Sequence, residues 1–147
     1  MINSIFDTST IPLLQRAAAF AEKRHEVLAG NVANLSTPDY KMRDLPVASF
    51  QAALREAVDQ RRNPAGVKDG NWMYASERAV APEKLFTADL FQAIEAPPRN
   101  LTFQDGNNRS IENQAIEMTK NSLMQQVAVE LMTIQMNRLQ AVISERA

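Results

Sequence analysis

Residues 30–41 read GNVANLSTPDYK, and they end a long helical pattern that enters from Thr10. Pro38 disfavours the helical conformation at the residue before it, which is Thr37. The four residues from Thr37 to Tyr40 fit a tight turn with Pro38 at its second position. A helix end defined this firmly fixes where the chain leaves the helix and in which direction it continues.

The segment before this turn, from Thr10 to Leu35, has high helix propensity. We expect Thr10 to be the N-cap, with Pro12 in the first turn, where its missing N–H does no harm. Apolar residues recur in alternating steps of four and three, which is the spacing of a coiled-coil seam. The seam positions are Leu14, Ala18, Ala21, His25, Leu28, Val32 and Leu35, and a flanking row contains Leu13, Ala17, Phe20 and Val27.

The same count describes the last zone of the chain, from about Ser110 to the end. The segment from Asn113 to Arg146 contains no Gly or Pro, so it predicts a helix of roughly 50 Å at ~1.5 Å per residue. Asn108 or Ser110 could cap its start. The seam positions are Ile111, Ala115, Met118, Ser122, Gln125, Val129, Met132, Met136, Leu139 and Ile143, and a second row contains Ile116, Leu123, Val127, Leu131 and Ile134.

Residues 45–107 differ from both ends because they hold five of the seven prolines. We expect a variable, loosely structured middle with one short helix over 48–62 and a second within EKLFTADLFQAI. The sequence therefore predicts a fold dominated by α-helices, in which the helices of 1–44 and 108–147 pair as a coiled coil around an irregular insertion. Such a pair leaves its flanking rows uncovered, and an uncovered apolar surface usually marks an assembly interface.

Composition excludes several classes of function. The chain has 147 residues with 16 basic and 17 acidic side chains, so no overall field attracts nucleic acid. It has no cysteine, which rules out disulfides, zinc–thiolate sites and thiol nucleophiles. No apolar run reaches the ~18 residues of a membrane span. We expect no standard secretory signal, because the first ten residues, MINSIFDTST, contain neither a basic nor an apolar segment. His25 has no second His or Cys as a partner, so we expect no metal, cofactor or catalytic site.

The stretch around the turn resembles the Asn-x-Ala-Asn-x-x-Thr-Pro-x-Tyr signature of bacterial flagellar rod and hook proteins. The C-terminal helical sequence is also similar to that of the shortest members of this family, and the chain has no room for the β domain of the longer ones. The family usually has Gly where Asp39 stands, so both a turn with positive φ and a type I turn stay open. The match falls on Asn31, Ala33, Asn34, Thr37, Pro38 and Tyr40.

This resemblance implies a non-enzymatic structural subunit of the proximal rod, which polymerises through its terminal helices into the motor's drive shaft. It implies export to the periplasmic rod by the flagellar type III apparatus without a cleavable signal. The implied partners are other copies of the chain, other rod proteins, base adaptor proteins and membrane-ring proteins. Asn31 and Asn34 would fix the register between subunits, and Pro38 and Tyr40 would set the bend. The expected assembly interface contains Leu14, Leu28, Asn31, Val32, Asn34, Leu35, Thr37, Pro38, Tyr40, Met118, Val129, Met132, Met136, Leu139 and Ile143.

Two alternatives remain. A cytoplasmic coiled-coil adaptor or export chaperone would show the same apolar stripes, with helices that are protected in the isolated protein. An enzyme finds support only in scattered carboxylates such as Asp39 and Asp44, because the two seams offer mostly Ala, Leu and Met.

Overall fold

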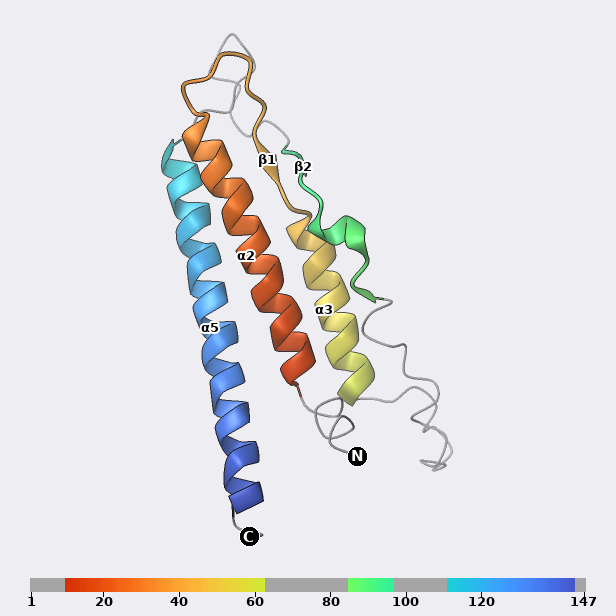
Figure 1. Cartoon of the computed structure of the whole chain (residues 1–147). Coiled ribbons are helices and arrows are strands. Elements are labelled where there is room, and N and C mark those ends of the chain that lie inside the picture. Colours follow the sequence, from red (N-terminus) through yellow and green to blue (C-terminus); the bar gives the residue numbers. More distant parts are fainter. Residues whose placement is uncertain (1–9, 63–84, 97–110, 145–147) are drawn as a thin grey trace. The chain divides into compact units, whose positions relative to one another are not determined.

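The computed structural model of the chain describes residues 10–62, 85–96 and 111–144. The chain divides into two units, one formed by residues 1–45 with 93–147 and the other by residues 46–92. The elements are α2 (Ile11–Ala33), β1 (Arg43–Asp44), α3 (Val47–Arg62), the 3₁₀ helix η3 (Ala88–Phe91), β2 (Ile94–Glu95) and α5 (Ile111–Ser144), as labelled in Figure 1.

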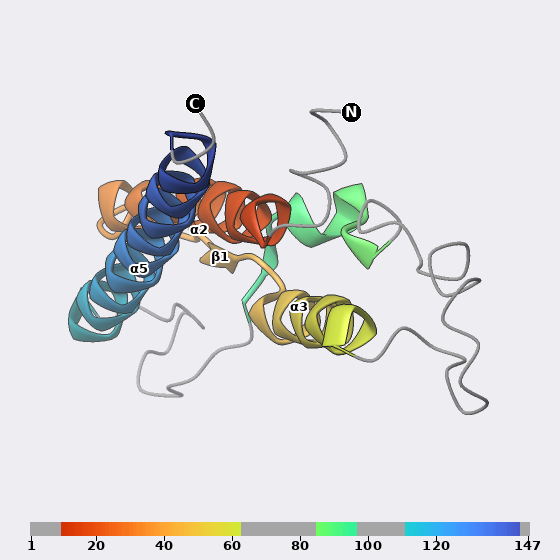
Figure 2. The same ribbon diagram turned by 90° about the horizontal axis from the view of Figure 1, so that it is seen from below.

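The two long helices of the first unit, α2 and α5, lie side by side and run antiparallel (Figure 1, Figure 2). Asn121 of α5 bonds the backbone of Ala21, whereas Glu117 pairs with Arg24, so residue numbers rise along α2 as they fall along α5. The predicted pairing of the terminal helices is therefore confirmed. With 34 residues against 23, α5 continues beyond the first residue of α2 (Figure 1).

The ends of α2 lie close to the predicted positions. Thr10 occupies the N-cap position with Pro12 in the first turn, but its backbone is helical and its side chain makes no capping hydrogen bond. At the other end the helix stops at Ala33, just before the predicted turn. The caps proposed for the C-terminal helix, Asn108 and Ser110, lie outside the described residues.

The predicted seam of α2 is buried only in part, at Ala21 and Leu28. His25 and Val32, two of its positions, are exposed. The buried row takes Leu13, Ala17 and Phe20 from the predicted flanking row and Leu28 from the predicted seam. It also includes two polar residues, Arg24 and Asn31, which a count of apolar residues leaves out.

The contact row of α5 is also more polar than predicted. Asn121 and Ala128 are its buried residues, whereas the predicted seam residues Val129, Met136 and Ile143 are exposed. The second row predicted on this helix is entirely exposed as well, so apolar side chains flank the contact on more than one side. This second row, hereafter the outer row, consists of Ile116, Leu123, Val127, Leu131 and Ile134.

A two-residue ladder completes the first unit. β1 pairs antiparallel with β2, with Arg43 opposite Glu95 and Asp44 opposite Ile94. The N–H of Ala96 also donates to the carbonyl of Met42 at 2.9 Å. The strand that follows the turn is thus held beside the strand that leads back toward α5.

In the second unit, α3 matches the predicted short helix to within one residue at its start. Of the second predicted helix, the structure describes residues 85–94, and these contain the 3₁₀ turn η3. The buried Phe50 has its ring centroid 5.5 Å from that of Phe86 and 6.4 Å from that of Phe91. This aromatic cluster joins α3 to the segment around η3.

Candidate assembly interface

Asn31 is the first residue of the signature motif, and it is 1% exposed. Its Nδ2 donates to the carbonyl oxygen of Arg43 at 2.6 Å, and its Oδ1 accepts from the N–H of Arg43 at 3.0 Å. The hydroxyl of Tyr40 donates to the same Oδ1 at 3.2 Å. A carboxamide carries one donor side and one acceptor side, as a peptide group does, so Asn31 attaches the returning chain to α2.

The turn itself is stabilised by Asn34 and Thr37. Nδ2 of Asn34 donates to the carbonyl of Gly30 at 2.9 Å, and the backbone N–H of Asn34 donates to the same oxygen at 3.1 Å. The N–H of Thr37 donates to the carbonyl of Asn34 at 3.0 Å, and the N–H of Tyr40 to the carbonyl of Thr37 at 3.4 Å. Asp39 has a φ of +58°, which selects the positive-φ turn from the two alternatives left open by the sequence.

Arg24 connects three segments that are distant in sequence. Its Nε and Nη2 donate to Oδ1 and Oδ2 of Asp44 at 2.8 and 2.7 Å, the paired geometry in which Arg binds carboxylates most strongly. Nη2 also donates to Oε2 of Glu117 on α5 at 2.8 Å. The Arg24 side chain is 7% exposed, so this ion pair is largely screened from water. Lys120 approaches the other oxygen of Glu117 at 3.2 Å.

The charges in this cluster perturb one another. The hydrogen bond from Arg24 lowers the pKa of Glu117 below its ordinary value, with burial opposing this and Lys120 adding to it. The hydrogen bond to Asp44 raises the pKa of Arg24 above its ordinary value, again against the effect of burial. Arg24 and Glu117 are therefore both charged at neutral pH.

Asn121 makes a further polar contact between the two helices. Its Nδ2 donates to the carbonyl oxygen of Ala21 at 2.7 Å. Its Oδ1 is buried and has no hydrogen-bond partner among the residues that the structure describes. An unsatisfied buried acceptor costs roughly 1–3 kcal/mol, so stability alone does not explain this residue.

Sequence reasoning missed Arg24, Asp44, Glu117 and Asn121 as contact residues. It named Asp44 only among the scattered carboxylates and counted only apolar positions along the helices. The available signal was the spacing, because Arg24 continues the steps of four and three from Ala17 and Phe20.

The predicted interface residues fall into three groups by exposure. Asn31 and Leu28 are buried. The amides of Asn31 and Asn34 have partners inside the chain, and their role between subunits stays a prediction. The half-buried residues are Leu14, Asn34, Leu35, Tyr40, Met118, Met132 and Leu139, and the exposed ones are Val32, Thr37, Pro38, Val129, Met136 and Ile143.

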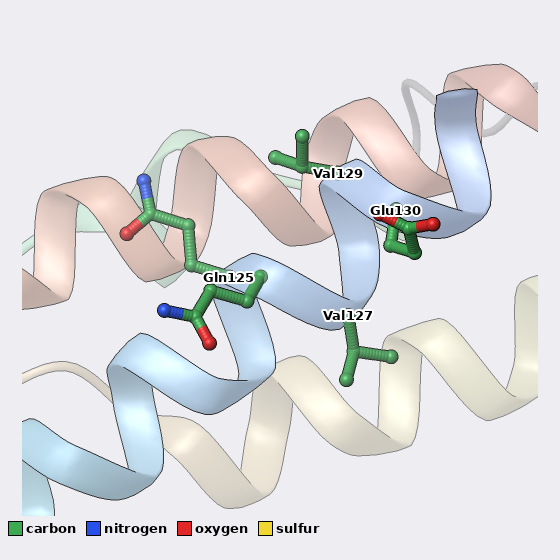
Figure 3. Close-up of a pocket in the computed structure, with 5 residues that line it drawn as sticks. Gln125, Val127, Val129 and Glu130 are labelled. Carbon is green, nitrogen blue, oxygen red and sulfur yellow. The ribbon is translucent and has the colours of Figure 1, made fainter.

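The remaining surface of α5 offers packing rather than chemistry. An open hollow lies along the segment from Gln125 to Glu130, and Figure 3 shows Val127 and Val129 leaving the helix on opposite sides. In the described part of the chain, no group of three or more His, Cys, Asp or Glu side chains could hold a metal ion. None of the described helices is both long enough and apolar enough to cross a membrane.

Comparison with known proteins gives consistent matches along nearly the whole chain. No family model matches. The chain is 31% identical over 137 residues to the flagellar basal body rod protein FlgB of Aquifex aeolicus, covering 93% of this chain and 94% of that protein. It is 27% identical over 139 residues to the FlgB of Proteus mirabilis, covering 93% and 95%. It is 27% identical over 137 residues to the FlgB of Bacillus subtilis, with the same coverage.

Proposed function

The chain belongs to the FlgB family of flagellar basal body rod proteins, and from this we propose that it polymerises through its terminal helices to form the proximal part of the motor's drive shaft. As a family member it is a structural protein of the basal body rod and not an enzyme. To this family role the proposal adds polymerisation and the transmission of torque.

The apolar surface of α5 carries this proposal. Among the described residues, ten of the twelve exposed large apolar side chains lie on this one helix. Each stabilises a folded or assembled state by roughly 1.5–3 kcal/mol when it is fully buried. Because the outer row and the predicted seam residues lie on different sides of α5, we propose that neighbouring subunits cover it from more than one direction.

The family also motivates the proposed route and partners. We propose that the subunit passes through the flagellar type III export apparatus without a cleavable signal and assembles in the periplasm. Its proposed contacts are other copies of the chain, other rod proteins, base adaptor proteins and membrane-ring proteins.

The test uses charge introduced into the outer row. A double variant, Leu123→Glu with Val127→Glu, would be expressed in a flagellated strain that lacks its own copy of the gene. Mass spectrometry of purified hook–basal bodies would measure how much of the chain is incorporated. We expect the natural chain at subunit-level amounts and the double variant reduced at least tenfold, because assembly would bury both carboxylates.

The matched control is Gln126→Glu with Thr133→Glu, which places the same charges at exposed polar positions of α5. We expect this variant to assemble at near-normal levels. Circular dichroism of both isolated variants would establish that α5 still forms. If the natural chain were absent from intact basal bodies and found in cytoplasmic complexes, the alternative of an adaptor or export chaperone would replace the rod proposal.

A further inference from the structure

We propose that Arg24 and Asn121 determine the axial register in which α2 and α5 pair, a positioning role that the apolar residues of α5 cannot fill. The argument rests on the contacts within one subunit. It extends the proposed function by explaining how each subunit would present the same surface to its neighbours.

Apolar packing alone leaves the pairing of α5 ambiguous. Hydrophobic burial is non-directional and scales with the area removed from water. Because α5 has large apolar side chains on both flanks of its contact row, a rotated or shifted helix would bury a similar apolar area against α2. Contacts that depend on atomic position must therefore select the observed arrangement.

Arg24 supplies such a contact. In the observed register its guanidinium meets Glu117 of α5 at 2.8 Å while it also binds Asp44. A shift of one heptad, about 10 Å along the axis, would bring Met124 to the position of Glu117. The guanidinium would then lose one of its two carboxylates in a site where it is largely buried, which is strongly unfavourable.

Asn121 supplies a second contact that depends on atomic position. In the described part of the chain, only the donor side of its amide has a partner, the carbonyl of Ala21. A buried polar residue in an otherwise apolar helix contact is the best-attested way of fixing register at a cost in stability. The Oδ1 of Asn121, which has no partner among the described residues, accounts for this cost in stability.

The same contacts fix the position of α5 relative to the signature turn. Arg24 binds Asp44, and the neighbouring Arg43 is bonded at its backbone by Asn31. The Arg24 guanidinium therefore connects α5 to β1, the strand that follows the turn. In a polymer, this would give every subunit the same offset between the turn and the outer row of α5.

Spin-label distances in the isolated protein test this directly. Because the chain contains no cysteine, Glu22→Cys with Glu112→Cys introduces one labelled pair at two exposed positions. We expect a single narrow distance distribution in this background. Adding Asn121→Leu should produce a second population that corresponds to an axial shift of about 10 Å, without lowering the unfolding temperature. Adding Arg24→Met should broaden the distribution further.

Two controls separate register from stability. Leu28→Ala removes a buried apolar side chain, and it should lower the unfolding temperature while the distance distribution stays single. Lys23→Gln removes an exposed charge beside Arg24 and should change neither quantity.

A single unshifted distance in Asn121→Leu would overturn the role of Asn121, and the same result in a folded Arg24→Met would overturn that of Arg24. If Arg24→Met does not fold, Asp44→Asn with Glu117→Gln, which weakens both ion pairs, replaces it under the same criterion. Failure of either positioning role would not contradict the rod proposal, because that proposal is tested by whether purified basal bodies contain the chain.

Discussion

The carboxamide of Asn31 bonds both polar groups of the Arg43 backbone, its Nδ2 lying 2.6 Å from the carbonyl oxygen and its Oδ1 3.0 Å from the amide nitrogen. The side chain thereby takes the place of a neighbouring strand on that residue. A signature asparagine that sequence reasoning assigned to contacts between subunits thus has a complete set of partners inside its own subunit.

Replacing Asn31 should therefore destabilise the isolated chain. Asn31→Leu leaves the N–H and C=O of Arg43 without this partner, and we expect a loss of roughly 2–3 kcal/mol in the free energy of unfolding. Asn31→Asp should cost a similar amount, because a carboxylate can accept from the N–H but cannot donate to the carbonyl. Urea unfolding measures both, with Asn34→Ala as a control that should cost only about 1 kcal/mol. Equal losses at the two asparagines would contradict the special role of Asn31.

The effects of substitutions at Asp39 on stability should reflect its positive φ of +58°. Asp39→Gly relieves the strain of a side chain in the left-handed region, although it also increases the freedom of the unfolded chain, so we expect a net change within about 1 kcal/mol. Asp39→Val should cost at least about 1–2 kcal/mol, because a β-branched residue tolerates this region poorly. Thermal unfolding of the two variants compares them, and a valine variant as stable as the glycine variant would show that the turn adopts another conformation.

The ion pair between Arg24 and Glu117 should make stability depend on pH in the acidic range. The folded pKa of Glu117 lies below its ordinary value, so its contribution is fully present above the ordinary Glu range near ~4.3. That contribution is lost as the pH falls through the lower pKa of the folded state. The unfolding temperature of the natural chain minus that of Glu117→Gln should therefore be positive and constant from pH 5 to 7. It should shrink below about pH 4.3, and a difference independent of pH would exclude this linkage.

Arg24 and Glu117 should also be energetically coupled through their ion pair. Arg24→Met leaves two carboxylates that are only 27% and 20% exposed without their shared cation, and we expect a loss of about 2 kcal/mol. In the double variant with Glu117→Gln, the loss should be smaller than the sum of the single losses by at least about 0.5 kcal/mol. Denaturant titrations of the four proteins give this coupling. Strict additivity would mean that Arg24 and Glu117 do not interact energetically.

The helices and their limits could be predicted from the sequence because local signals specify them. Pro38 ends the first helical pattern, and the long segment without Gly or Pro after Asn113 produces α5. The contact rows could not be predicted by counting apolar residues, because Arg24 and Asn31 are buried through partners that come from β1 and α5. The φ of Asp39 was likewise beyond the sequence, since an aspartate accepts either turn. Features that depend on neighbouring residues could be predicted from the sequence. Features that depend on partners distant in the sequence could not.

The distribution of apolar residues on α5 also has a calorimetric consequence. Folding normally carries a large heat-capacity change of ~12–15 cal/mol/K per residue, because apolar surface leaves water in that step. In this chain the outer row stays hydrated after α2 and α5 have paired. The heat-capacity change of unfolding should therefore be small for the length of the chain, and the missing part should appear when subunits associate. Rising temperature would then strengthen association relative to folding, so the finished polymer would tolerate heat better than its free subunit.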